Sequence, residues 1–228
     1  MARTMKAAAA QAVRRDAFVD VALRLITVKG YEQMSVQDVL EEAGASKGAF
    51  YHYFDSKRAL LLAVIERMTD AALEQLSPLL HDPNLSAVEK LDGFFRGIAA
   101  WKGERKDLVL GATETWASDD NAIVREKGRR SARDRVAPIV AAIVRQGVEE
   151  GLFTVGSPDD TAMVVVSLIL GFQEIAVDLF FARQAGAITF EAVERGLAAE
   201  LEALDRILGV PAGSFRGLDR ATLRQWFD

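Results

Sequence analysis

Apolar residues recur along almost the whole chain at the three- to four-residue spacing of an α-helix. The first such stripe occupies one helix face and consists of Phe18, Val21, Ala22, Leu25 and Ile26. Lys29 and Gly30 follow this stripe. The lysine places a positive charge in the last turn of the helix, and the glycine ends the helix. Strand-like alternation never lasts more than a few residues. The pattern therefore predicts an all-α protein.

Caps and breakers divide this pattern into separate helices. Ser35 precedes a short apolar segment and has Asp38 three residues further on, which is a capping arrangement, and Gly44 ends the segment. Ser46 begins a second short helix, and Ser56 caps a long one. After the first helix we expect helices at about 36–43, 47–54, 57–76, 86–101, 105–117, 120–150, 159–184 and 190–208, with a final turn at 219–227.

Composition narrows the class of protein. Half of the 228 residues are apolar, which is ordinary for a globular chain. The absence of cysteine and the presence of only two histidines exclude disulfides, thiol nucleophiles and a histidine-rich metal site, so we expect no metal and no cofactor. The charged N-terminus lacks the apolar segment of a signal peptide, and the apolar stretch 162–172 is too short to span a bilayer. We interpret that stretch as a buried helix of a cytoplasmic protein without membrane contact.

Charge is distributed unevenly along the chain. Residues 1–60 hold nine basic and seven acidic side chains, whereas the remainder holds 19 basic and 26 acidic ones, within a total of −5. A slightly basic end on an acidic body favours a local anionic partner over general binding to polyanions.

The segment "AGASKGAFYHYFDSK", residues 43–57, carries the most distinctive chemistry. Two short helices joined at "AGAS" predict a helix-turn-helix, with Gly44 supplying the positive φ of the turn. Phe50 and Phe54 are four residues apart and should pack on the first helix. The opposite face then presents Lys47, Tyr51, His52 and, with packing as an equal alternative, Tyr53. Donors on stiff or cationic side chains suit phosphates and base edges, although a helical hairpin with a solvated face is the competing interpretation.

The run "KGYEQMSVQDVLEEAGASKGAFYHYFDSKRALL" resembles the DNA-binding domain of TetR/AcrR-type regulators. The resemblance covers residues 11–62 and matches the family pattern at nearly every position. Ala45 stands where valine is common, and Leu40 where alanine is common. Beyond residue 63 the likeness is only architectural. The family resemblance implies a three-helix helix-turn-helix domain at 1–58, with an arm at 1–10. A helical effector-binding and dimerisation domain would follow at 59–228.

The resemblance also implies which side chains touch DNA. Tyr51 and Lys57 would bind phosphates, and Lys47, Ala49 and His52 would face base edges. The full expected set is Ser35, Ser46, Lys47, Gly48, Ala49, Tyr51, His52, Tyr53 and Lys57. Basic residues near the N-terminus would extend the contact or remain solvated and mobile, namely Arg3, Lys6, Arg14 and Arg15.

Family members are two-fold dimers whose last two long helices pack into a four-helix bundle, here about 159–184 and 190–208. Such a dimer would read an inverted repeat in double-stranded DNA. The later helices also gather residues that would suit an apolar or aromatic effector, or simply a core: Phe94, Trp101, Thr113, Trp116, Phe172 and Gln173. The sequence thus predicts a ligand-responsive regulator, foremost a repressor. The sequence contains no set of catalytic residues that would indicate an enzyme. The alternative function is a helical protein-interaction module without DNA binding.

Overall fold

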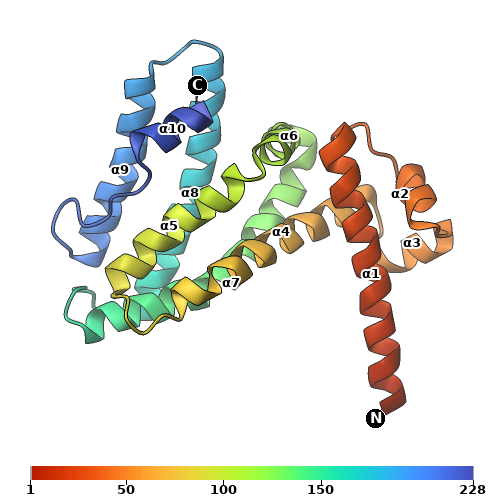
Figure 1. Cartoon of the computed structure of the whole chain (residues 1–228), viewed down its shortest axis with the longest axis horizontal. Helices are drawn as coiled ribbons and strands as arrows, with labels where there is room; N and C mark the ends of the chain where they lie inside the picture. The colour runs from red at the N-terminus through yellow and green to blue at the C-terminus, as the bar shows by residue number, and fades with distance from the viewer. Residues whose placement is uncertain (1, 228) are drawn as a thin grey trace. The chain divides into compact units, whose positions relative to one another are not determined.

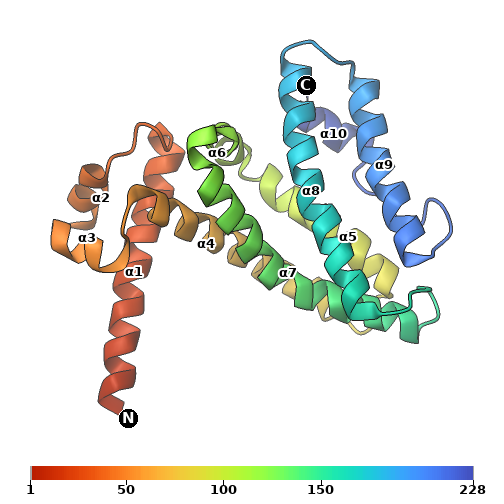
Figure 2. The same cartoon turned by 180° about the vertical axis from the view of Figure 1, so that it is seen from behind.

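The structure is a computed structural model that describes residues 2–227, without the side chains of residues 2–10, 114, 116, 117 and 119 (Figures 1 and 2). Every regular element within residues 2–227 is helical, so the all-α prediction is confirmed. In chain order the elements are α1 (Ala2–Lys29), α2 (Val36–Ala43), α3 (Lys47–Tyr53), α4 (Lys57–Leu80), α5 (Ala87–Gly103), α6 (Lys106–Ala117), the 3-10 turn η1 (Asp119–Asn121), α7 (Ala122–Glu149), α8 (Pro158–Gln184), α9 (Phe190–Leu208) and α10 (Arg220–Phe227).

The chain folds into two compact units that each combine two segments. Unit 1 consists of Met1–Ala71 and Arg105–Ser131, and unit 2 consists of Ala72–Glu104 and Ala132–Asp228. Both α4 and α7 therefore contribute to both units. The expected domain boundary at residue 58 falls at the second residue of α4, inside unit 1, and it stays a prediction about which segments bind DNA.

Aromatic packing against α1 holds unit 1 together. Phe50 is fully buried, and its ring meets that of Phe18 edge-on with centroids 5.7 Å apart. Phe54 lies on the other side of Phe18, at 6.3 Å, again edge-on. Such pairs add about 0.5–1.5 kcal/mol each beyond the burial of their area. They fix the short helix α3 against α1, although seven residues are too few for a stable helix alone.

The predicted caps form in unit 1. The Ser35 hydroxyl accepts from the Asp38 amide at 3.1 Å, and the Asp38 carboxylate in turn accepts from the Ser35 amide at 2.6 Å. Gly44 ends α2 with φ of 59°, the left-handed conformation that favours glycine. Ser46 and Ser56 each accept an amide hydrogen bond from the residue three positions on. These local bonds explain why the bounds of α2 and α3 follow from the sequence.

Unit 2 contains two apolar clusters. In the larger cluster, α8 contributes Val165, Val166, Ile169 and Leu170, and α9 contributes Leu204 and Leu208. The smaller cluster joins the start of α9 to α10 through Phe190, Val193, Leu223 and Phe227. The segment between α9 and α10 is held by two buried carboxylates. Asp205 accepts from the amides of Gly213 and Phe215, and Asp92 from those of Arg216 and Gly217.

Helix α8 differs from the buried helix expected for this stretch. The whole helix has 27 residues and by length and composition is long and apolar enough for a membrane span, although the stretch 162–172 considered in the sequence covers only part of it. Only 22% of its most apolar window is buried within the chain. The inner face packs into the core of unit 2, whereas the outer face leaves four apolar side chains exposed: Met163, Val164, Ile175 and Phe181. The same length and composition occur in core helices of soluble proteins, so the helix alone does not indicate a membrane.

Helix α4 extends four residues beyond its expected end and contains Pro78. Proline removes one N–H donor from a helix, and near the last turn this costs a single hydrogen bond. At the end of the helix, His81 donates from both its backbone amide and its ring Nδ1 to the Ser77 carbonyl, at 3.1 and 2.8 Å.

Candidate nucleic-acid interface

Helix α3 separates an inner apolar face from an outer polar one. Phe50 at its centre and Phe54 directly after it are buried, as the spacing predicted. Lys47, Tyr51 and His52 are exposed, with 46% of Tyr51 accessible. A short helix fixed by aromatic packing on one side and presenting cationic and hydrogen-bonding groups on the other has the form of a recognition helix.

Aromatic contacts also restrict the exposed side chains of α3. The Tyr51 ring stands edge-on to Phe50 at 5.3 Å, and the Lys47 ammonium lies 6.0 Å from the Tyr51 centroid. Tyr53 is half-buried, with its ring 6.1 Å from that of Phe18. Of the two roles considered for Tyr53, packing is therefore the one that this structure displays.

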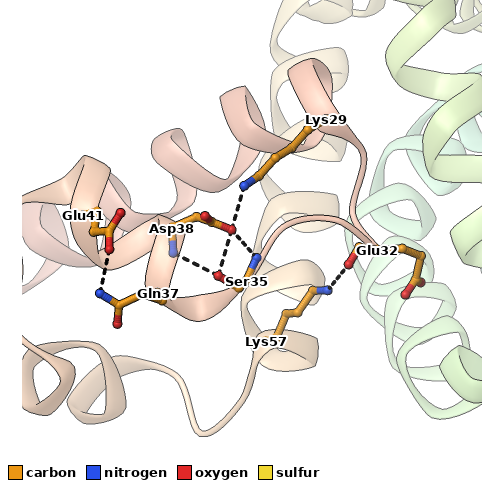
Figure 3. A network of polar contacts seen from close by, with 7 residues as sticks. All are labelled: Lys29, Glu32, Ser35, Gln37, Asp38, Glu41 and Lys57. Carbon is orange, nitrogen blue, oxygen red and sulfur yellow. Dashed lines mark hydrogen bonds and ion pairs between the residues drawn. The ribbon is translucent and has the colours of Figure 1, made fainter.

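The N-terminus of α2 is already engaged by a carboxylate, as Figure 3 shows. Asp38 accepts hydrogen bonds from the amide and hydroxyl of Ser35, and it pairs with the Lys29 ammonium at 2.7 Å. The hydrogen bond from Lys29, followed by those from Ser35, holds the pKa of Asp38 far below its ordinary value. A phosphate approaching this helix end would meet an ionised carboxylate, so the Ser35 hydroxyl acts here as a cap.

Lys57 is directed toward the turn between α1 and α2 (Figure 3). Its ammonium donates to the Glu32 carbonyl at 3.3 Å and lies 4.1 Å from the centroid of the Tyr31 ring. Burial lowers the pKa of Lys57, against the opposing charges of Glu32 and Asp38. To bind a phosphate in the way the family resemblance implies, the side chain would leave these two contacts.

Gly48 leaves open space beside the backbone of α3, whereas Ala49 is half-buried against the core of unit 1. A Cβ atom built at Gly48 would meet nothing nearer than the Ser46 hydroxyl at 4.0 Å, and the glycine lies within a regular helix. Packing within the protein therefore does not require glycine here. The absence of a side chain at this position would allow another molecule to approach the backbone closely.

The expected N-terminal arm is the first part of α1, which is helical from Ala2. The side chains of Arg3 and Lys6 lie outside the described residues. The Arg15 guanidinium stacks on the Phe54 ring at 5.2 Å, and Gln11 Nε2 lies 3.3 Å from Nε2 of His52. Sequence reasoning did not select Gln11. The available signal was its position four residues before Arg15 and seven before Phe18, on one helix face.

The residues expected around an effector are not gathered in one unit. Phe94 and Trp101 are buried in unit 2, where Phe172 is half-buried and Gln173 exposed. Thr113 belongs to α6 in unit 1 and donates to the Val109 carbonyl at 2.7 Å. The Trp116 side chain lies outside the described residues. The effector site stays a prediction.

In unit 2, the sequence analysis selected the polar residue Gln173 but missed Glu200. On α9, Glu200 lies on the same face as Val193, Leu197 and Leu204, between the two apolar clusters. On α8, Gln173 follows the buried Val166 and Ile169 along the inner face, yet it is exposed. Burial raises the pKa of Glu200 to about 8, so its carboxyl is largely protonated at neutral pH.

The fold and the outer face of α3 together define a helix-turn-helix regulatory protein. Residues 18–64 match the family model described as bacterial regulatory proteins, tetR family. The chain is 28% identical over 153 residues to the transcriptional repressor NemR of Escherichia coli K12, covering 65% of this chain and 76% of NemR. It is 36% identical over 63 residues to the uncharacterized transcriptional regulator YvdT of Bacillus subtilis, where the match spans 32% of the relative's length.

Solved structures extend the likeness over most of the chain. The reduced form of E. coli NemR aligns with 87% of this chain and 100% of its own, at 25% identity and a TM-score of 0.50. The complex of RolR with resorcinol aligns with 93% of this chain and 98% of its own, at a TM-score of 0.64 and 20% identity, which is a likeness of fold. The chain belongs to the tetR family of bacterial regulatory proteins. Its relatives are regulators, which at the level of the family supports the expectation that it is not an enzyme.

Proposed function

We propose that this chain is a cytoplasmic, ligand-responsive transcriptional repressor that binds an inverted-repeat operator as a homodimer. The observation that carries the proposal is the outer face of α3, where Lys47, Tyr51 and His52 are exposed on a helix locked to α1. This face lies within the segment that matches the tetR family model. The side chains combine one positive charge, a phenol and an imidazole, which suit phosphate oxygens and base edges.

The outer face of α8 supports the homodimer. Val164, Gly171 and Ile175 lie on that face, spaced seven and then four residues apart, with Val164 53% and Ile175 51% exposed. On α9, Ala198 and Ala199 are exposed between charged residues, so another helix could approach closely. An apolar helix face of this size on a regulator is best covered by a second copy related by a two-fold axis. Two α3 helices related in that way would read an inverted repeat.

The proposed effector is a small apolar or aromatic molecule bound in unit 2. The resorcinol complex of RolR shows that a protein of this fold binds a phenolic ligand. In this chain, Gln173 and Glu200 would offer an amide and a protonated carboxyl between two apolar clusters. Effector binding would release DNA by changing the separation of the two recognition helices in the dimer.

The test is binding-site selection from a random duplex library at two salt concentrations. We expect an enriched inverted repeat whose affinity falls steeply with salt, because phosphate contacts dominate the binding free energy. K47A should lower affinity for the enriched site and reduce the salt slope by about one. K127A is the matched control, since Lys127 is an exposed lysine of the same unit. Equal losses in both variants would indicate general charge attraction and not a recognition helix.

The competing function is a helical protein-interaction module without DNA binding. It predicts that the folded, effector-free dimer enriches no sequence at either salt concentration. A folded dimer that enriches nothing would reject the repressor proposal in favour of this alternative.

A further inference from the structure

One face of α1 lies along the C-terminal half of α3. Gln11, Arg15 and Phe18 are spaced four and three residues apart and thus share that face. Phe18 packs on Phe50, Arg15 stacks on Phe54, and Gln11 reaches His52. We propose that Gln11 is a positioning residue that holds the His52 imidazole in one orientation and one tautomer, and thereby helps to set the operator sequence. The inference rests on the proposed function of α3 in binding DNA.

The geometry assigns the proton on the His52 ring. Gln11 Nε2 faces His52 Nε2 at 3.3 Å, and an amide nitrogen can only donate. The ring Nε2 is therefore the acceptor, which places the proton of the neutral imidazole on Nδ1. On its other side the ring stands edge-on to Tyr53, with centroids 4.8 Å apart. The imidazole is exposed yet held from two directions.

A fixed Nδ1–H makes His52 a donor toward whatever lies in front of α3. In the major groove the acceptors are guanine N7 and O6, adenine N7 and thymine O4, whereas cytosine offers a donor. His52 should therefore prefer a base that presents an acceptor. Without Gln11 the ring could turn or change tautomer, and its Nδ1 could then accept as well as donate. The preference at that position should consequently weaken.

The DNA experiment compares binding-site selection by the wild type, Q11A, H52A and the double variant. We expect Q11A to relax the preference at the same symmetric pair of positions as H52A, by on the order of 5- to 20-fold, part of the discrimination that one direct base contact provides. Q11A should have no further effect in the H52A background, since it acts through that ring. V13A is the control, because Val13 is a neighbouring side chain with 69% exposure.

A second experiment needs no DNA. Long-range ¹H–¹⁵N spectra of the imidazole rings report the tautomer, and the chain has only His52 and His81 to assign. We expect His52 in the Nδ1–H form in the wild type and in a mixture of tautomers in Q11A. His81 serves as the internal reference, since its Nδ1 donates to Ser77 independently of Gln11. An unchanged His52 spectrum in Q11A would overturn the positioning role.

The outcomes separate this inference from the function on which it rests. If the wild type enriches an inverted repeat and Q11A lowers affinity equally for all sequences, Gln11 contacts the DNA backbone and the inference is wrong. Additive losses in the double variant would reject it in the same way. If the wild type enriches no sequence, the DNA-binding proposal itself fails, and the effect on operator choice fails with it.

Discussion

The two units of the chain use their surfaces in opposite ways. Unit 1 buries Phe18, Phe50 and Phe54 and exposes Lys47, Tyr51 and His52 on α3. Unit 2 exposes apolar side chains along α8 and keeps polar ones inside, with Asp92 and Asp205 buried. Polar groups at the surface of a rigid helix can read a polar partner, whereas an exposed apolar face must be covered. This contrast fits the proposed roles of unit 1 in binding DNA and of unit 2 in binding a second copy of the chain.

The largest expected effect comes from placing charge on the outer face of α8. V164E combined with I175E would put two carboxylates into the proposed dimer interface, where burial without partners is strongly unfavourable. We expect a monomer in analytical ultracentrifugation and a loss of operator affinity on the order of 10³-fold, the lower end of the gap between specific and non-specific binding.

The control for this variant is I123E, because Ile123 is 72% exposed and lies in unit 1. It introduces the same type of charge without touching α8, and it should remain a dimer. A V164E/I175E protein that sediments as a dimer would show that the outer face of α8 is not the dimer interface. The contrast drawn here between the surfaces of the two units would then no longer hold for unit 2.

The buried carboxylates of unit 2 give the next effect. Asp205 is 4% exposed and accepts from Gly213 and Phe215 in the segment that leads to α10. D205A would leave the buried amide of Phe215 and the part-buried amide of Gly213 without this acceptor, so we expect a loss of about 1–3 kcal/mol in the free energy of unfolding. D134A, which removes an exposed carboxylate of the same unit, should change stability little. Equal denaturation midpoints for D205A and the wild type would show that the segment is not held by this side chain.

Sequence patterns predicted those parts of the fold that local hydrogen bonds determine. Helix α9 spans Phe190–Leu208 as expected, since Thr189 caps its start and Gly209 ends it with φ of 66°. The end of α4 was missed, because a proline near the last turn costs too little to stop the helix.

The site was predictable only in part. The apolar and polar faces of α3 followed from helical spacing, but two contacts did not. Gln11 reaches His52 across 41 residues of sequence, and Lys57 bonds to the Glu32 carbonyl across 25. Both depend on where α1 and its following turn lie in space. Glu200 was not predicted, because a single acidic residue on an apolar helix face forms no sequence pattern that would indicate a site.

Gly48 tests the interface on the side of unit 1. Packing leaves room for a methyl group at this position, and alanine favours a helix more than glycine does. We therefore expect G48A to be more stable than the wild type, with a free energy of unfolding higher by about 0.5–1 kcal/mol. If the α3 backbone approaches DNA closely, the same variant should bind the operator about tenfold more weakly, a loss within the range for one disturbed contact. Normal operator affinity in a stabilised G48A protein would place the duplex away from this turn of α3.

The smallest expected effect concerns the acid inside unit 2. Burial raises the pKa of Glu200 to about 8 in the folded chain, whereas an unfolded glutamate titrates near its ordinary value of about 4.3. Between these values the native state binds more protons than the unfolded state, so this group makes stability fall as pH rises. E200Q should remove that slope, and its gain over the wild type in urea midpoint should grow from pH 5 to pH 8. E202Q, on the exposed face of the same helix, should leave the slope intact. Parallel pH profiles for E200Q and the wild type would mean that Glu200 is hydrated and ionised, and that the interior of unit 2 is less apolar than its two clusters indicate.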